Sequence, residues 1–173
     1  MKKLLVERDN NSITRVTGIL TVIITGIMDF ILFPIIEKNT EGIKAFDMNS
    51  FGYSYEQAEK FLELIGERGR NVYLKIQLPL DFVYPVIYTV FFETLITALS
   101  KKITPLLGIP AALFCFDYAE NICSVVMLRD MKTTKALART ASTFTLIKSL
   151  LMYTTFLIII VYFVLWNKAR KEK

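Results

Sequence analysis

The sequence contains no histidine and only two cysteines, and these absences exclude several kinds of site. Cys115 and Cys123 fall on one predicted helix, about 12 Å apart along its axis, which is too far for a disulfide between them. We expect both to be buried thiols. Because histidine and cysteine pairs at metal-ligand spacing are missing, we expect no zinc, haem or iron–sulfur site, no other metal and no cofactor.

An acidic excess is also missing, since 21 Lys and Arg residues stand against 16 Asp and Glu residues, for a net charge of +5. The basic residues gather at the two ends of the chain. A basic excess can indicate nucleic acid, but basic residues beside apolar runs are typical of membrane topology signals and of contacts with anionic lipid headgroups. We therefore expect membrane lipids as partners and no nucleic acid.

Hydrophobic residues make up 53% of the chain, and the mean hydropathy is +0.43. Four apolar runs, at about 16–36, 79–100, 103–128 and 141–166, approach or exceed the roughly 20 residues that a membrane-spanning helix needs. The first run is too long for the core of a signal peptide and lacks a cleavage site, so we expect it to remain as a helix. The sequence predicts an all-α integral membrane four-helix bundle, with residues 1–173 forming a single domain.

An even number of spans places both termini on one side of the membrane. The tails and the turn at 101–102 are short and densely basic, which predicts cytoplasmic termini and an external loop at 37–77. We expect a multi-pass protein of a bacterial or archaeal cell membrane or of the endoplasmic reticulum. Within the loop, SYEQ at 54–57 fits a capping box, and apolar residues follow at helical spacing. This predicts a short amphipathic helix at about 54–66 that lies on the membrane or caps the bundle, with Gly66 and Gly69 as its stop.

Polar side chains interrupt all four spans. In the third, Asp117, Glu120 and Asn121 are spaced i, i+3 and i+4, so they share one face of a helix. A charge in the hydrocarbon centre costs at least about 2.5–3.5 kcal/mol, so such groups are expected to cluster, pair or take up protons. Most of the polar residues fall at one depth, in the half of the membrane that faces the long loop, whereas Glu93 does not. The set at that depth also includes Asp29, Asp81 and Lys148, and Tyr84 and Tyr88 share one face of the second span with Asp81.

We expect these residues to line a polar pocket between the helices and to bind a ligand there. The alternative is a buried polar network that only fixes the register of the helices. For Lys148, an ion pair with an acid and a side chain extended toward the interface are both open. Just before the second span, Arg68, Arg70 and Tyr73 suit a lipid phosphate, and they suit simple anchoring at the interface equally well.

The layout resembles the EXPERA family, which includes emopamil-binding sterol isomerases and the sigma-two receptor. The matching parts are IMDFILFP at the end of the first span, the long first loop, LPLDFVYPVIY in the second span, ITP at the start of the third and the basic tail NKARKEK. The resemblance implies a four-helix bundle with an intramembrane cavity where acids bind cationic amphiphiles or sterols, and it makes Asp29 the acid that pairs with the ligand. The absence of histidine, and FDYAEN in the third span, depart from the family pattern.

Three functions remain open at this point. The first is binding of a small amphiphile, lipid or sterol-like ligand in an acidic intramembrane pocket. The second is an enzyme that modifies lipids, with two of Asp81, Asp117 and Glu120 as acid and base, and with a hard divalent cation as a further option. The third is a structural or regulatory membrane subunit. A homodimer is a further open possibility.

Overall fold

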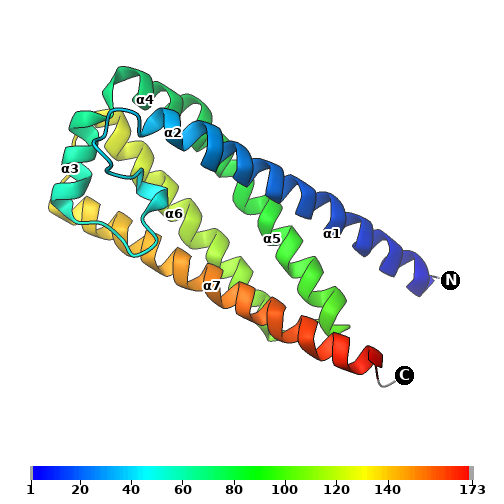
Figure 1. Ribbon diagram of the computed structural model, residues 1–173. Helices are drawn as coiled ribbons and strands as arrows, with labels where there is room; N and C mark the ends of the chain where they lie inside the picture. Colours follow the sequence, from blue (N-terminus) through cyan, green and yellow to red (C-terminus); the bar gives the residue numbers. More distant parts are fainter. Residues whose placement is uncertain (1, 172–173) are drawn as a thin grey trace.

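The computed structural model describes residues 2–171, with side chains from residue 11 onward, and all regular structure within that part is helical. Four stretches are long and apolar enough to cross a membrane, namely Asn11–Ile36, Gly66–Ser100, Pro105–Asp130 and Lys135–Lys171. This confirms the predicted all-α four-helix membrane bundle (Figure 1). Its α-helices are α1 (Lys2–Ile27), α2 (Phe33–Ile36), α3 (Tyr55–Leu64), α4 (Gly66–Val72), α5 (Leu78–Ser100), α6 (Gly108–Asp130) and α7 (Lys135–Lys171).

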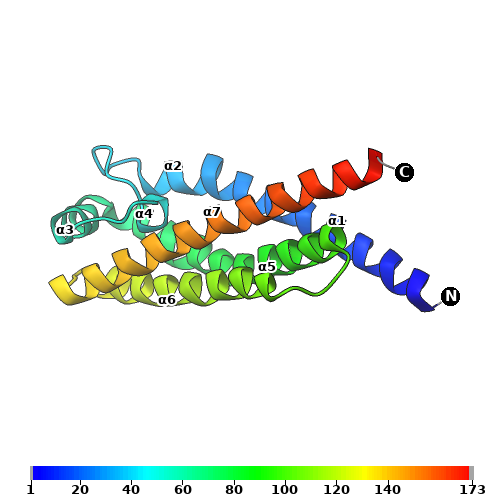
Figure 2. The ribbon, with the colours of Figure 1, turned by 90° about the horizontal axis from the view of Figure 1, so that it is seen from below.

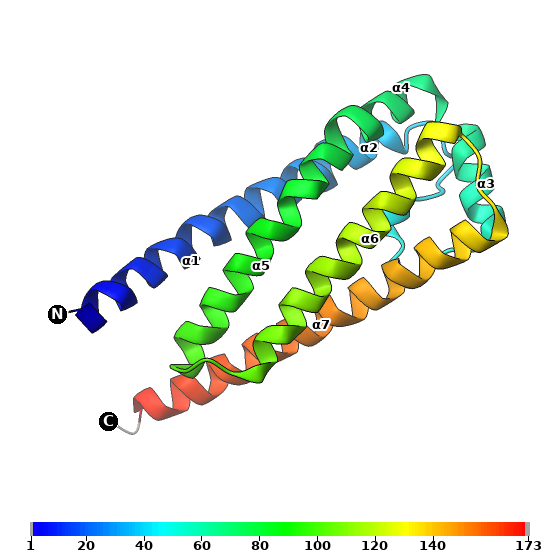
Figure 3. The same ribbon diagram turned by 180° about the vertical axis from the view of Figure 1, so that it is seen from behind.

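The long helices lie side by side rather than in a closed square. Helix α1 packs along α5, whereas α5, α6 and α7 pack against one another. Seen from behind, α5 and α6 occupy the middle, with α1 beside α5 and α7 beside α6 (Figure 3). Both termini lie at one end of the bundle, and α3, α4 and the long loop lie at the other (Figures 1 and 2). Most of the buried polar residues belong to α5, α6 and α7, where these three helices pack against one another.

Two spans contain a π-helical turn, and each turn comes just before a proline. One covers Met28–Leu32, before Pro34, and the other covers Tyr73–Gln77, before Pro79. Proline has no N–H to donate, and its ring clashes with the carbonyl four residues earlier, so the preceding turn widens. The helices continue through both sites, which joins α1 to α2 and α4 to α5. The prolines thus change the helical period without ending the span.

The predicted loop helix is present as α3. The Ser54 hydroxyl accepts from the Gln57 N–H and the Gln57 side chain accepts from the Ser54 N–H, so the capping box is complete. Gly66 has a φ of 65°, a conformation that suits glycine, and it separates α3 from α4. Gly69 was expected to help stop the helix but lies inside α4. A Cβ at Gly69 would sit 2.9 Å from the Ile36 carbonyl oxygen, so this glycine allows α4 to approach α2 closely.

Helix α3 caps the bundle instead of lying free on its surface. Its Ala58, Phe61 and Leu62 are buried. Phe61 makes an edge contact with Phe46, with ring centroids 4.9 Å apart. The long loop is therefore folded onto the loop end of the bundle.

Several predicted boundaries move outward. The second span begins at Gly66 rather than near 79, and the fourth runs over Lys135–Lys171 rather than 141–166. The apolar run marks only the part of a helix that could face lipid, while the helix itself continues into polar residues. The prediction of two buried thiols is wrong for Cys115, which is exposed, whereas Cys123 is buried.

Candidate functional site

A single lysine lies among carboxylates inside the bundle. Lys148, on α7, forms ion pairs with Glu120, with Asp117 at 3.3 Å from its Nζ, and with Asp47 at 4.0 Å. The Lys148 side chain is 14% exposed and the Glu120 side chain is fully buried. Charges removed from water in this way are tolerated when they are paired closely and hydrogen-bonded. For Lys148 the ion pair is therefore the outcome, rather than extension to the interface.

The acids on α6 are held from two sides. The Tyr88 hydroxyl, on α5, donates to Asp117 Oδ2 at 2.7 Å. The Thr145 hydroxyl, one turn before Lys148 on α7, donates to Glu120 Oε1 at 2.6 Å. Asp117 and Glu120 are three residues apart, so one face of α6 presents both to the lysine, as the spacing predicted. These hydrogen bonds connect three spans through the cluster.

A loop residue that the sequence pattern did not predict, Asp47, completes the cluster. Asp47 lies in the short 3-10 turn Phe46–Met48, and its Oδ2 accepts from the Tyr73 hydroxyl at 2.6 Å. Burial raises the pKa of Asp47; Lys148 and the Tyr73 hydrogen bond oppose this rise, and Asp117 adds to it. The sequence does contain one indication that Asp47 is buried. It is flanked by two large apolar residues, Phe46 and Met48, unlike most acids of this loop.

The side-chain amide of Asn121 is hydrogen-bonded to the backbone of α5. Pro85, inside α5, has no N–H for the Asp81 carbonyl oxygen four residues earlier. The Asn121 side chain donates to that oxygen at 2.9 Å. The hydroxyl of Tyr118 donates to the next carbonyl, that of Phe82. Freed carbonyls inside a membrane need such donors, so α6 fastens itself to the proline site of α5.

The Asp81 carboxyl is buried in the same region but does not join the lysine. The residue is 3% exposed, and Lys148 makes its ion pairs with the other three acids. Asp81 Oδ2 has no hydrogen-bond partner, and the same holds for Asn121 Oδ1, Ser124 Oγ and both amide atoms of Gln77. Gln77 is one turn from Asp81 and Ser124 is about one turn from Asn121. The two neighbouring helices thus carry a patch of unsatisfied polar groups next to the ion pairs.

The remaining residues predicted for the pocket divide into two groups. Tyr84 and Tyr88 pack edge to face, with ring centroids 5.0 Å apart, and the Tyr84 hydroxyl is 2.7 Å from that of Thr25 on α1. Asp29, however, is exposed while Met28 beside it is buried. The expectation that Asp29 would share a cavity with Asp81 and Asp117 is therefore not met, because Met28, one turn after the buried Ile24, faces inward and Asp29 does not. Glu93 is half-buried and likewise takes no part in the cluster.

The three residues predicted to bind a lipid headgroup have different surroundings in the structure. Arg70 donates to the carbonyl oxygens of Leu128 at 2.8 Å and Arg129 at 2.6 Å, and so binds the C-terminal turn of α6. Tyr73 is fully buried against Asp47, which leaves it out of reach of a headgroup. Arg68 is exposed. Of the three, only Arg68 has the exposure that contact with a lipid headgroup requires.

Two hollows lie at the ends of the bundle, away from the ion pairs. One, of about 390 Å³, lies between the start of α3 and α7, and its lining includes Tyr53, Lys135 and Arg139. The other, of about 370 Å³, lies between the ends of α5 and α7. Among the described side chains, no group of three or more His, Cys, Asp or Glu residues is placed to hold a metal ion. The centre of the carboxylates is instead occupied by Lys148.

In comparisons with known proteins, no family model, curated protein or solved structure matches this chain.

Proposed function

We propose that this multi-pass membrane protein binds a small cationic amphiphile, whose amine is recognised next to Asp81 and Asp117. The supporting observation is the imbalance of the buried cluster, in which four carboxyls accompany one lysine and Asp81 receives none of the lysine's ion pairs. An unpaired carboxylate is costly in this environment and requires a proton or a cation. The ammonium group of a ligand supplies that cation.

The side chains around Asp81 suit an ammonium group. Residues 81, 84 and 88 follow one another along one face of α5, and the rings of Tyr84 and Tyr88 are in contact. Aromatic faces attract cations, and the attraction is strongest where water is excluded. A carboxylate with two tyrosine rings therefore offers both the charge and the ring faces that an organic amine requires.

The apolar part of the ligand has a route toward α1. Helix α1 packs mainly on α5, and the contact between the Thr25 and Tyr84 hydroxyls joins the two helices next to the cluster. The hollows described above lie elsewhere, and we propose that the amine reaches its site when this contact separates. The resemblance of the layout to the EXPERA family points to the same class of ligand.

A structural role is the second candidate, and a specific observation favours it. The chain of contacts from Tyr73 through Asp47 and Lys148 to Glu120 and Thr145 joins the loop, α6 and α7. A network of this kind fixes helix register without any ligand. In this alternative the excess carboxyls hold protons and serve only to fasten the helices.

Thermal unfolding of the purified full-length chain distinguishes the two candidates. The probes are a long-chain tertiary amine and the uncharged alcohol of equal chain length, added to the protein in detergent. We expect the amine to raise Tm and the alcohol to have no effect. A ligand at 100 times its Kd stabilises by about 2.7 kcal/mol, which is easily measured.

Asp81→Asn removes the unpaired carboxylate and keeps the shape of the side chain. We expect the variant to fold and to lose the shift caused by the amine. Glu93→Gln is the matched control, since Glu93 lies on the same helix outside the cluster, and it should keep the shift. If the amine shifts neither the wild type nor the control, while Asp81→Asn unfolds, the polar cluster is structural and the binding function is wrong.

A further inference from the structure

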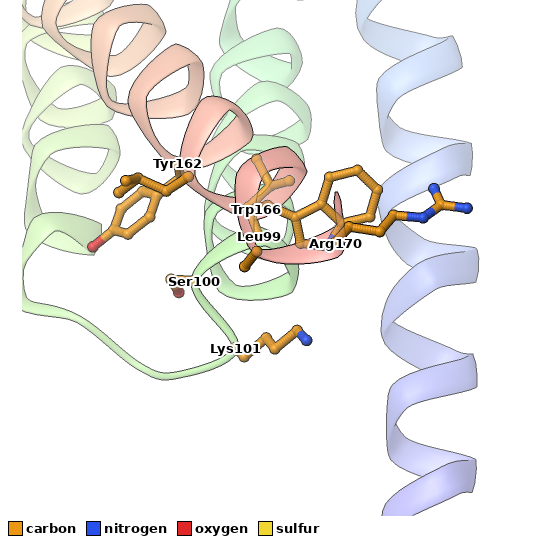
Figure 4. Close-up of a pocket in the computed structure, with 8 residues that line it drawn as sticks. Leu99, Ser100, Lys101, Tyr162, Trp166 and Arg170 are labelled. Atoms are coloured by element: carbon orange, nitrogen blue, oxygen red, sulfur yellow. The ribbon is translucent and has the colours of Figure 1, made fainter. Parts of the chain in front are cut away.

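A second hollow, at the end of the bundle that carries both termini, has the composition of a lipid site. It measures about 370 Å³ and lies between the C-terminal turn of α5 and the last turns of α7 (Figure 4). It is far along the chain from the carboxylate cluster, and the proposed amine site makes no use of it. Its lining comprises Leu99, Ser100, Lys101, Tyr162, Leu165, Trp166, Ala169 and Arg170.

The charged side chains that line this hollow are all basic. Lys101 and Arg170 are its charged side chains, and no acidic residue is part of it. Among the described side chains, neither of the two forms a salt bridge. Lys102, Lys168 and Lys171 lie close by in the sequence and add to the positive potential. An anion in the hollow would therefore meet two cations within a larger basic field.

The backbone and a ring position the two basic side chains. Lys101 follows the last residue of α5 and has a φ of 58°, a left-handed conformation in which glycine would be less strained. Its N–H donates to the Thr97 carbonyl oxygen at 2.9 Å, which holds the turn. The Arg170 guanidinium lies 5.5 Å from the centroid of the Trp166 ring. Figure 4 shows Arg170 extending past Trp166 toward α1, with Lys101 on the neighbouring turn.

The rest of the lining is suited to the membrane interface and to hydrocarbon. Tyr162, Trp166 and Arg170 are spaced by four residues, so they follow one face of α7. Tyrosine and tryptophan are enriched where apolar chains meet headgroups, because each ring combines an apolar body with a polar group. Leu99 and Leu165 supply the aliphatic part of the lining. The hollow thus combines cationic, aromatic and aliphatic side chains, which are the groups that the headgroup, interface and acyl parts of a lipid molecule contact.

We propose that this hollow binds an anionic phospholipid, with the phosphate between Lys101 and Arg170 and an acyl chain against Leu99 and Leu165. Arginine and lysine are the common phosphate-binding side chains, and arginine can donate two parallel hydrogen bonds. The expected cytoplasmic position of this end places the hollow in the leaflet where anionic lipids attract basic segments. A free phosphate ion would use only the two basic residues and would leave the apolar lining uncovered.

Native mass spectrometry of the full-length protein in detergent tests this site. The probes are a phosphatidylglycerol and a phosphatidylcholine with identical acyl chains, together with glycerol 3-phosphate as the soluble headgroup. We expect the wild type to retain phosphatidylglycerol in preference to phosphatidylcholine and to bind no glycerol 3-phosphate at equal concentration. Equal retention of the two lipids would overturn the proposal, and binding of glycerol 3-phosphate as tight as that of the lipid would show a phosphate site instead.

Two double variants separate the hollow from general surface charge. Lys101→Gln with Arg170→Gln removes both charges from the lining, whereas Lys102→Gln with Lys168→Gln removes two charges from the same end outside it. We expect the first to lose phosphatidylglycerol affinity by on the order of tenfold and the second to lose much less. Equal losses in the two variants would show that diffuse charge, and no defined site, attracts the lipid. Both variants change exposed or end-of-helix residues, and thermal unfolding would establish that each is folded.

Discussion

Lys148 on α7 pairs with Glu120 on α6, and the Glu120 side chain is completely buried. Each residue also has a second partner, since Lys148 Nζ lies 3.3 Å from Asp117 Oδ1 and Thr145 donates to Glu120 Oε1. In a low-dielectric interior, breaking such a pair from one side leaves a charge without compensation. The pair therefore links α6 to α7 in one register, and removing either partner alone is expected to be costly.

The first prediction is that Lys148→Met destabilises the protein by about 3–5 kcal/mol, the cost of leaving a buried charge without its partner. Chemical denaturation in detergent would measure the change. The double variant Lys148→Met with Glu120→Gln should recover part of the loss, because both charges of the closest pair are then gone. If the single and double variants are equally unstable, the ion pair does not account for the loss.

The second prediction concerns the pH dependence of stability. The pKa of Asp47 is raised in the folded protein, mainly by burial. The folded state then holds this proton at a pH where the unfolded chain has released it, so the free energy of unfolding falls as pH rises. The fall begins near the ordinary Asp value of about 3.9 and ends once the pH has passed the raised folded value.

Asp47→Asn should flatten this part of the stability curve. The asparagine carbonyl oxygen can still accept from the Tyr73 hydroxyl, which bonds to Asp47 Oδ2 at 2.6 Å in the wild type. Denaturation of both proteins between about pH 4 and pH 8 would supply the comparison. Other acids titrate in both, so the test is the difference between the two curves, and parallel curves would contradict the role assigned to Asp47.

The sequence predicted the membrane spans and much of the cluster because both follow from periodicity. Asp117, Glu120 and Asn121 share a face by spacing alone, and a charge such as Lys148 in a span needs a partner. Pro85 was visible as a source of a free carbonyl, and Asn121 satisfies that carbonyl. The sequence could not show that the two are opposite each other, since this depends on how α5 and α6 pack.

Helical periodicity did not predict the positions of two acids, Asp29 and Asp47. Asp29 continues a stripe that includes Thr25 by a spacing of four, yet it is exposed, because the buried face of the helix is the one that carries Ile24 and Met28. Asp47 has no period to follow, since the long loop positions it through tertiary contacts with Tyr73 and Lys148. Local pattern therefore identified the acids on α6, but it misjudged which face of the first span is buried and missed the acid that the loop positions.

The third prediction concerns the contact between α1 and α5. A Cβ at Gly18 would lie 2.8 Å from Phe91 Cε2, whereas one at Gly26 would have no heavy atom within 4 Å. Gly18→Leu should therefore overpack the interface and destabilise it by about 1–3 kcal/mol. Gly26→Leu on the same helix is the control and should be close to neutral. Protease accessibility of α1 in detergent, together with Tm, would detect the difference, and equal behaviour of the two variants would contradict the packing described.

The last prediction is the orientation in the membrane, with both termini and the turn between α5 and α6 in the cytoplasm and the long loop outside. Short basic segments at the terminal end of the bundle carry the positive-inside signal. Phe51 in the loop is 88% exposed and Ile103 in the opposite turn is 85% exposed, so single cysteines at these positions report on the two sides. Neither replacement alters a charge, which leaves the topology signal intact.

Cys115 is exposed and must first be replaced by alanine, and the buried Cys123 is replaced with it. In intact cells, a membrane-impermeant thiol reagent should label Phe51→Cys and should label Ile103→Cys only after permeabilisation. The opposite pattern would reverse the orientation and would move the proposed anionic lipid site to the outer leaflet.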